Sequence, residues 1–121
     1  MAREIVGNVG GKPYSPGTKN ENIVFLSGQL GLNDGTLVAG GVGPETRQTL
    51  DNLVAVLDKA GGTLDDVMMV NIYLTDLAGD YSEMNKVYVE YFGGSPPARA
   101  TVEVSNLVFG GQVESSAIAI L

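Results

Sequence analysis

Apolar side chains recur with helical spacing in two segments of the chain. The first segment has Pro44 near its start and Gly61 at its end, where these residues are common in helices. The second starts near Asp80, which stands at capping-box spacing from Glu83, and it stops at Gly93. Both segments are therefore predicted to be helices. The apolar positions are Leu50, Leu53, Val54 and Leu57 in the first, and Met84, Val87, Tyr88 and Tyr91 in the second.

Runs rich in β-branched and aromatic residues predict strands at residues 4–9, 23–29, 67–74, 100–104 and 113–121. Gly110 and Gly111 indicate a turn between the last two strands, which we expect to pair as a hairpin. The order of elements is then β-β-α-β-α-β-β. No repeat or long linker divides the chain, so we expect one domain spanning residues 1–121. An α+β fold with two helices on one face of a mixed sheet fits this order.

The predicted strands lack the clean alternation of apolar and polar residues found in half-exposed sheets. Along residues 67–74 both alternate sets of side chains are largely apolar, and residues 23–26 behave in the same way. Because two helices cover only one face, the second face would be a large exposed apolar patch. We therefore expect a homo-oligomer, in which clefts between subunits are natural ligand sites.

The chain has no cysteine and no histidine, which narrows its chemistry. Disulfides, thiol nucleophiles, Ser-His triads and typical zinc sites all require one of these residues, so we expect no metal. Proton transfer near neutral pH would then depend on carboxylates, tyrosines, lysines or water.

The 121 residues carry a net charge of −7, and the seven basic residues are scattered. Nucleic-acid binding usually needs a basic patch, so we expect no nucleic-acid partner. No apolar run approaches the roughly 20 residues of a membrane-spanning helix, and the N-terminus lacks a secretory pattern. We therefore expect a soluble cytoplasmic protein without a membrane partner, with a mitochondrial pool left open.

In so acidic a chain, an anionic ligand would depend on a local cation. Arg99 enters a strand directly after residues 96–98, which include two prolines, so its guanidinium projects from rigid backbone. Arginine holds carboxylates through two parallel hydrogen bonds. Arg99 is therefore our candidate anchor for a small carboxylate ligand, and an ion pair with Glu103 or Glu114 is the alternative.

Glu114 lies in the last predicted strand and is the candidate general base. A carboxylate beside an apolar strand end can position a water molecule for attack. A solvated glutamate at a strand end is the alternative for this residue.

Four further residues are candidates for ligand contact. Tyr14 lies in a loop before the second strand, and Asn85 lies beside the apolar stripe of the second helix. Ser27 and Gly28 lie within a strand, where glycine marks a bulge or a close approach. The alternatives are a surface tyrosine, a solvent-facing asparagine and tight sheet packing.

Nearly the whole chain resembles the Rid proteins (reactive intermediate deaminases), also called the YjgF family. Each matching piece is short, but their order and spacing together are specific. The pieces are Pro13-Tyr14-Ser15, Leu26-Ser27-Gly28-Gln29, residues 46–53 and 70–76, Met84-Asn85, Pro97-Ala98-Arg99, Val102-Glu103-Val104, and residues 113–120.

The resemblance implies a chorismate-mutase-like fold and a homotrimer with sites at the subunit interfaces. It also implies a cofactor-independent hydrolase, a 2-iminobutanoate/2-iminopropanoate deaminase that converts reactive imines and enamines to 2-keto acids and ammonia. Arg99 would bind the substrate carboxylate and Glu114 would activate water. The pocket would be lined by Tyr14, Ser27, Gly28, Asn85 and the backbone of Thr101. Many members have cysteine where this chain has Thr101, which alters the ligand contacts there.

Two other functions stay open from the sequence. Some similar proteins are described as non-catalytic binders of small carboxylates or as chaperone-like. Others are described as endoribonucleases that inhibit translation, although the net charge of −7 and the missing histidine argue against this activity.

Overall fold

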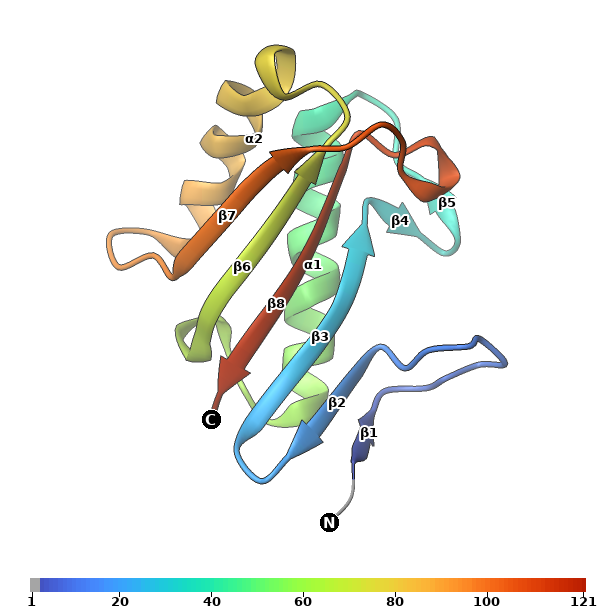
Figure 1. Cartoon of the computed structure of the whole chain (residues 1–121), viewed down its shortest axis with the longest axis vertical. Coiled ribbons are helices and arrows are strands. Elements are labelled where there is room, and N and C mark those ends of the chain that lie inside the picture. Colours follow the sequence, from blue (N-terminus) through green and yellow to red (C-terminus); the bar gives the residue numbers. More distant parts are fainter. Residues whose placement is uncertain (1–2) are drawn as a thin grey trace.

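The computed structural model describes residues 3–121, in which both helices cover the same face of one six-stranded sheet (Figure 1). The strand order in this sheet is β1-β2-β3-β8-β6-β7, and β4 and β5 form a separate small ribbon. The elements are β1 (Glu4–Val6), β2 (Gly17–Asn20), β3 (Ile23–Leu30), β4 (Leu32–Asn33), β5 (Thr36–Leu37), α1 (Val42–Ala60), β6 (Val67–Leu74), α2 (Leu77–Phe92), β7 (Ala98–Glu103) and β8 (Val113–Ile120), with short 3₁₀ turns at Leu64–Asp66 and Val108–Gly110.

The order of the main elements is as predicted, and the α+β class is confirmed. Strands β2, β4 and β5 were not predicted. β2 has four residues and no large apolar side chain, and β4 and β5 have two residues each, so none of them carries a periodic signal. Helix α1 begins two residues earlier than Pro44, at Val42. Val54 was predicted to lie on its apolar face but is 37% exposed.

The prediction that the second helix begins near Asp80 is wrong, because α2 starts at Leu77. Asp76 is its N-cap and accepts a hydrogen bond from the Gly79 N–H at 3.0 Å. Glu83 caps another helix: its carboxylate accepts a hydrogen bond from the Gly43 N–H in the first turn of α1, at 2.9 Å. Gly41, the N-cap of α1, supplies no side-chain cap, so Glu83 satisfies one of the free N–H groups there.

The prediction that the last two strands pair as a hairpin is also wrong. β8 lies in the middle of the sheet, antiparallel to both β3 and β6, whereas β7 runs parallel to β6 at the edge. The central position of β8 accounts for its regular alternation of buried and half-buried residues. Its buried side chains Val113, Ala117 and Ala119 join the core under α1.

The sheet face opposite the helices is open and apolar, as the two-sided pattern predicted. Figure 1 shows this face toward the viewer, with α1 behind it. One row of paired residues crosses the open face from β1 to β7: Ile5, Thr18, Phe25, Ile118, Met69 and Ala98. Ile5 and Phe25 are 57% and 49% exposed, so this face is available to a partner. Within the described residues, neither helix has the length and apolar character needed to cross a membrane.

Candidate functional site

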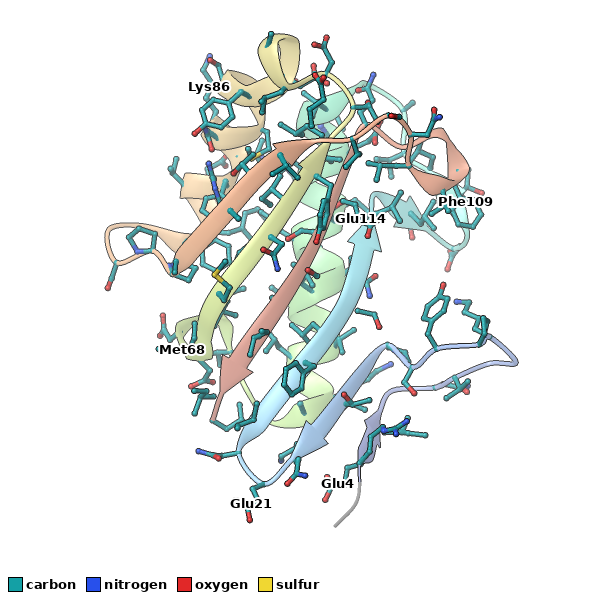
Figure 2. All side chains as sticks on the ribbon, in the orientation of Figure 1. Glu4, Glu21, Met68, Lys86, Phe109 and Glu114 are labelled. Atoms are coloured by element: carbon teal, nitrogen blue, oxygen red, sulfur yellow. The ribbon has the colours of Figure 1, made fainter. Side chains whose placement is uncertain are left out.

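Glu114 lines a cavity of about 760 Å³ together with Tyr14, Ser27 and Gly28. These four residues form the Glu114 half-site. The register between β3 and β8 shifts between Leu26 and Gln29, and Gly28 lies in this irregular segment. A Cβ atom at Gly28 would overlap the Glu114 carboxylate, so glycine is required for the close approach. Figure 2 labels Glu114 near the upper ends of β8 and β3.

The loop that carries Tyr14 is fastened to β3 by Ser27. The Ser27 hydroxyl donates to the carbonyl oxygen of Ser15 at 2.6 Å, and the Ser27 N–H donates to that of Pro16 at 2.9 Å. Ser27 therefore positions the loop. Tyr14 itself is 55% exposed beside the cavity, where it is free to contact a ligand.

The start of β8 is held in place by Glu45 of α1. Its buried carboxylate accepts a hydrogen bond from the Gln112 N–H at 2.7 Å. Burial raises the pKa of Glu45, and the N–H groups of Gln112 and Val113 oppose this rise. The contact fixes the backbone two residues before Glu114.

Burial in the cavity wall raises the pKa of Glu114 above its ordinary value of 4.5. Within residues 3–121, desolvation is the sole cause of this shift. A carboxylate with a raised pKa is a stronger base than a solvated one, as a general base for water requires.

Arg99 lies on β7 and is held by two tyrosines of α2. Its guanidinium carbon lies 4.6 Å from the centre of the Tyr88 ring and 5.8 Å from that of Tyr81. Its Nη2 donates to the Tyr81 hydroxyl at 3.3 Å. Cation–π stacking and a hydrogen bond thus orient the guanidinium.

The buried Tyr88 hydroxyl has no well-aligned hydrogen-bond partner in the described part of the chain. Burial raises the pKa of Tyr88, and the charge of the nearby Arg99 opposes this rise. The hydroxyl remains able to donate to a group bound at Arg99.

The alternative in which Arg99 forms an ion pair with Glu103 or Glu114 is wrong within a single chain. Among residues 3–121 the one ion pair between side chains joins Arg47 and Glu90 at 3.0 Å. Glu103 instead accepts a hydrogen bond from the Leu77 N–H at 2.9 Å. Apart from the hydrogen bond of Nη2 to Tyr81, the Arg99 guanidinium therefore has no carboxylate partner in the described residues.

Asn85 and Thr101 flank Arg99 from two sides. Asn85 shares a hollow of about 270 Å³ with Arg99 and Tyr88, and Thr101 shares one of about 610 Å³ with Arg99 and Tyr81. We call Asn85, Arg99 and Thr101 the Arg99 half-site. It lies at the free edge of the sheet, since β7 pairs only with β6 in residues 3–121.

The structure does not bring the two half-sites together within one chain. Arg99 is in register with Val70, whose buried side chain faces the helices. Glu114 is in register with Tyr73, which points to the open face. The two predicted catalytic residues thus lie on opposite faces of the sheet, with β6 between their strands.

Several supporting residues escaped the sequence interpretation. Tyr81 and Tyr88 stand at i and i+7 with Asn85 between them at i+4, so they share one face of α2. Three residues with polar side-chain ends on one helix face could have been interpreted as a ligand-binding surface. The role of Glu45 could not be predicted from local sequence patterns, because its partner Gln112 lies far away in the sequence.

Comparison with known proteins supplies the family. The family profile described as Endoribonuclease L-PSP matches residues 9–121. A RutC family protein from Pyrococcus horikoshii is 45% identical over 109 residues, which are 88% of this chain and 86% of that protein. A protein of Bos taurus named 2-iminobutanoate/2-iminopropanoate deaminase is 41% identical over 110 residues, covering 89% and 80% of the two chains.

Solved structures agree with this assignment. A Rid family protein of unknown function from Yersinia pestis superimposes with a TM-score of 0.92 at 36% identity, covering 99% of this chain and all of that one. The match extends over every element that carries the two half-sites. The chain therefore belongs to the YjgF/RutC/Rid family and has its chorismate-mutase-like fold.

Proposed function

We propose that the protein is a cofactor-independent hydrolase that converts 2-imino acids, such as 2-iminopropanoate, to 2-keto acids and ammonia. The observation that carries the proposal is the free, oriented guanidinium of Arg99, which suits a substrate carboxylate. The raised pKa of Glu114 supports its role as the base, and the names of relatives such as the Bos taurus protein favour the same reaction. We further propose that it acts in the cytoplasm.

The complete site requires residues from two copies of the chain. Arg99 and Glu114 lie on opposite faces of one sheet, so one chain cannot place both on a single small substrate. The open apolar face provides a surface on which copies can associate. We propose a homotrimer in which the Arg99 half-site of one copy faces the Glu114 half-site of the next.

The chemistry needs little beyond orientation and one base. Arg99 binds the substrate carboxylate, with Asn85 and Thr101 at its sides. Glu114 takes a proton from water as the water oxygen bonds to the imine carbon, and it passes this proton to the imine nitrogen to give the carbinolamine. Glu114 then takes the proton of the carbinolamine hydroxyl and delivers it to the nitrogen as the C–N bond breaks, so that ammonia leaves and the 2-keto acid remains. Tyr14 lies close enough to the cavity to contact the substrate.

Pyruvate formation from 2-aminoacrylate tests this proposal. The enamine is generated in situ by a dehydratase, and the rate is compared with and without the protein. We expect acceleration by the wild type and little by Arg99→Ala, because losing charge-assisted hydrogen bonds costs about 1.5–3 kcal/mol each. A wild type no faster than Arg99→Ala would refute the proposal.

A non-catalytic carboxylate binder is the second candidate, because Arg99 alone would account for binding. Carboxylate binding that persists in Glu114→Ala, without turnover by the wild type, would favour it. The family description also names endoribonuclease activity. The net charge of −7 counts against RNA as a ligand, and RNA cleavage abolished by a half-site variant would be required to support it.

A further inference from the structure

The cavity beside Glu114 continues along α1 as a groove. Its floor consists of four residues of α1 at i, i+3, i+4 and i+7, namely Asn52, Ala55, Val56 and Lys59. The Asn52 amide donates to the carbonyl oxygens of Leu30 and Leu32, both at 3.0 Å, and Leu30 is in register with Glu114. Asn52 therefore marks the Glu114 end, and Lys59 lies about 10 Å further along the helix axis at 1.5 Å per residue.

The walls of the groove are largely apolar. Pro16 and Leu32 lie along it, and Val108 and Phe109 form its rim. Val108 and Phe109 are 61% and 66% exposed, so both side chains are accessible to a bound molecule. Phe109 also adopts a left-handed backbone conformation, with φ of 60°. Methylene groups of a bound molecule would find apolar contact along these walls.

Two lysines also line the groove. Lys12 comes from the loop between β1 and β2, and Lys59 from the last turn of α1. Neither takes part in an ion pair within the described residues. Glu114 is the one acidic residue that lines the cavity. In a chain of net charge −7, this groove is therefore locally cationic.

The size of the cavity exceeds what a three-carbon imine fills. Its volume of about 760 Å³ is within the range of about 300–1,000 Å³ that drug-sized ligands occupy. In the isolated chain, 2-iminopropanoate would fill only part of this volume.

We propose that this groove is a side-chain subsite and that the preferred substrates are 2-imino acids whose side chain ends in a carboxylate, as in the imine of glutamate. The inference rests on the proposed function, because it places the reacting carbon at Glu114. The side-chain methylenes lie against Leu32 and Val56, and the terminal carboxylate reaches Lys59 and Lys12.

Binding of two stable product-like acids tests the subsite without requiring turnover. Calorimetry compares 2-oxoglutarate with 2-oxopentanoate, which has the same number of carbons and no terminal charge. We expect the wild type to bind 2-oxoglutarate roughly three- to tenfold more tightly, as partly exposed charge pairs allow. Lys59→Met and Lys12→Met should each reduce this ratio, and the double variant should abolish it. The control Lys86→Met removes the same charge from α2, outside the groove, and should keep the ratio.

A wild type that binds 2-oxopentanoate as tightly as 2-oxoglutarate would overturn the subsite, as would a ratio that survives in the double variant. The two proposals fail separately. A lysine-dependent preference without turnover of either 2-iminopropanoate or the imine of glutamate would refute the deaminase and support the groove as a binding site for dicarboxylates. Turnover of 2-iminopropanoate without the preference would refute the groove alone.

Discussion

The guanidinium carbon of Arg99 lies 4.6 Å from the centre of the Tyr88 ring, so this cation stacks on an aromatic face. Tyr81 adds a hydrogen bond at 3.3 Å from the same helix. Arginine keeps its planar hydrogen-bonding edge available in such a stack. Helix α2 therefore orients a side chain that belongs to β7, before any ligand arrives.

Tyr81→Phe should weaken substrate binding with little effect on the chemical step. It removes the hydroxyl that fixes Arg99 and leaves the ring. A hydrogen bond of this kind contributes about 0.5–1.5 kcal/mol, which predicts a roughly two- to tenfold rise in KM with kcat nearly unchanged. Steady-state kinetics with 2-iminopropanoate provide the measurement.

Tyr91→Phe is the matched control for that substitution. It removes a hydroxyl from the same helix, one that donates to Asp51 at 2.7 Å and lies outside the Arg99 hollows. We expect an unchanged KM. A fall in kcat for Tyr81→Phe, or equal effects of both variants on KM, would show that Tyr81 does not position Arg99.

Gly28→Ala should reduce turnover strongly, because the added Cβ would displace the Glu114 carboxylate. Misplacement of a catalytic group by about 1 Å can cost roughly 100-fold, so we expect a loss of this order in kcat. Gly94→Ala is the control, since no atom lies within 4 Å of a Cβ placed there. Wild-type kcat in Gly28→Ala would contradict the assigned role of Glu114.

Glu114→Gln should increase the free energy of unfolding at neutral pH. The folded-state pKa of Glu114 is raised by burial, so the folded protein binds this proton more tightly than the unfolded chain does. The ionised group therefore destabilises the fold above the raised pKa, and glutamine removes that cost. The gain should shrink as pH falls through the raised pKa and vanish below the ordinary value of 4.5. Denaturant unfolding of both proteins between pH 4 and pH 8 measures it. A gain that is independent of pH would contradict this explanation.

Glu83→Ala should destabilise the fold, because the Gly43 N–H at the start of α1 would lose its acceptor. Loss of a helix cap costs about 0.5–2 kcal/mol. Glu83→Gln keeps an acceptor oxygen and should recover part of this loss. Equal stability of Glu83→Ala and the wild type in urea unfolding would show that the cap contributes nothing.

Periodicity was sufficient to predict the long elements of the fold, and insufficient for the pairing of its strands. The apolar stripes of α1 and α2 are local properties, so the sequence predicts both helices. The position of β8 between β3 and β6 depends on contacts between residues at least 39 positions apart, which local patterns do not encode. The start of α2 was predicted near Asp80 because Asp80 and Glu83 have capping-box spacing. In the structure, Glu83 accepts a hydrogen bond from the first turn of α1 instead.

The candidate site was predicted residue by residue, but its division between two faces was not. Arg99 and Glu114 were both chosen as candidates, and the incorrect hairpin suggested that their strands are neighbours. Only the observed register separates them, with Arg99 beside Val70 and Glu114 beside Tyr73. The expectation of an oligomer came from the apolar pattern and, separately, from the family resemblance. Under the proposed function, the separation of the two residues gives a catalytic reason for it.

Mixing of two inactive variants tests most directly whether copies of the chain share each site. Arg99→Ala and Glu114→Ala are refolded separately and together, and 2-iminopropanoate turnover is measured. In a randomly mixed cyclic assembly, about one site in four would combine an intact Arg99 with an intact Glu114 from neighbouring copies. We therefore expect the mixture to recover roughly a quarter of the wild-type rate, while each variant alone stays inactive. A mixture no more active than the separate variants would contradict a catalytic site shared between copies.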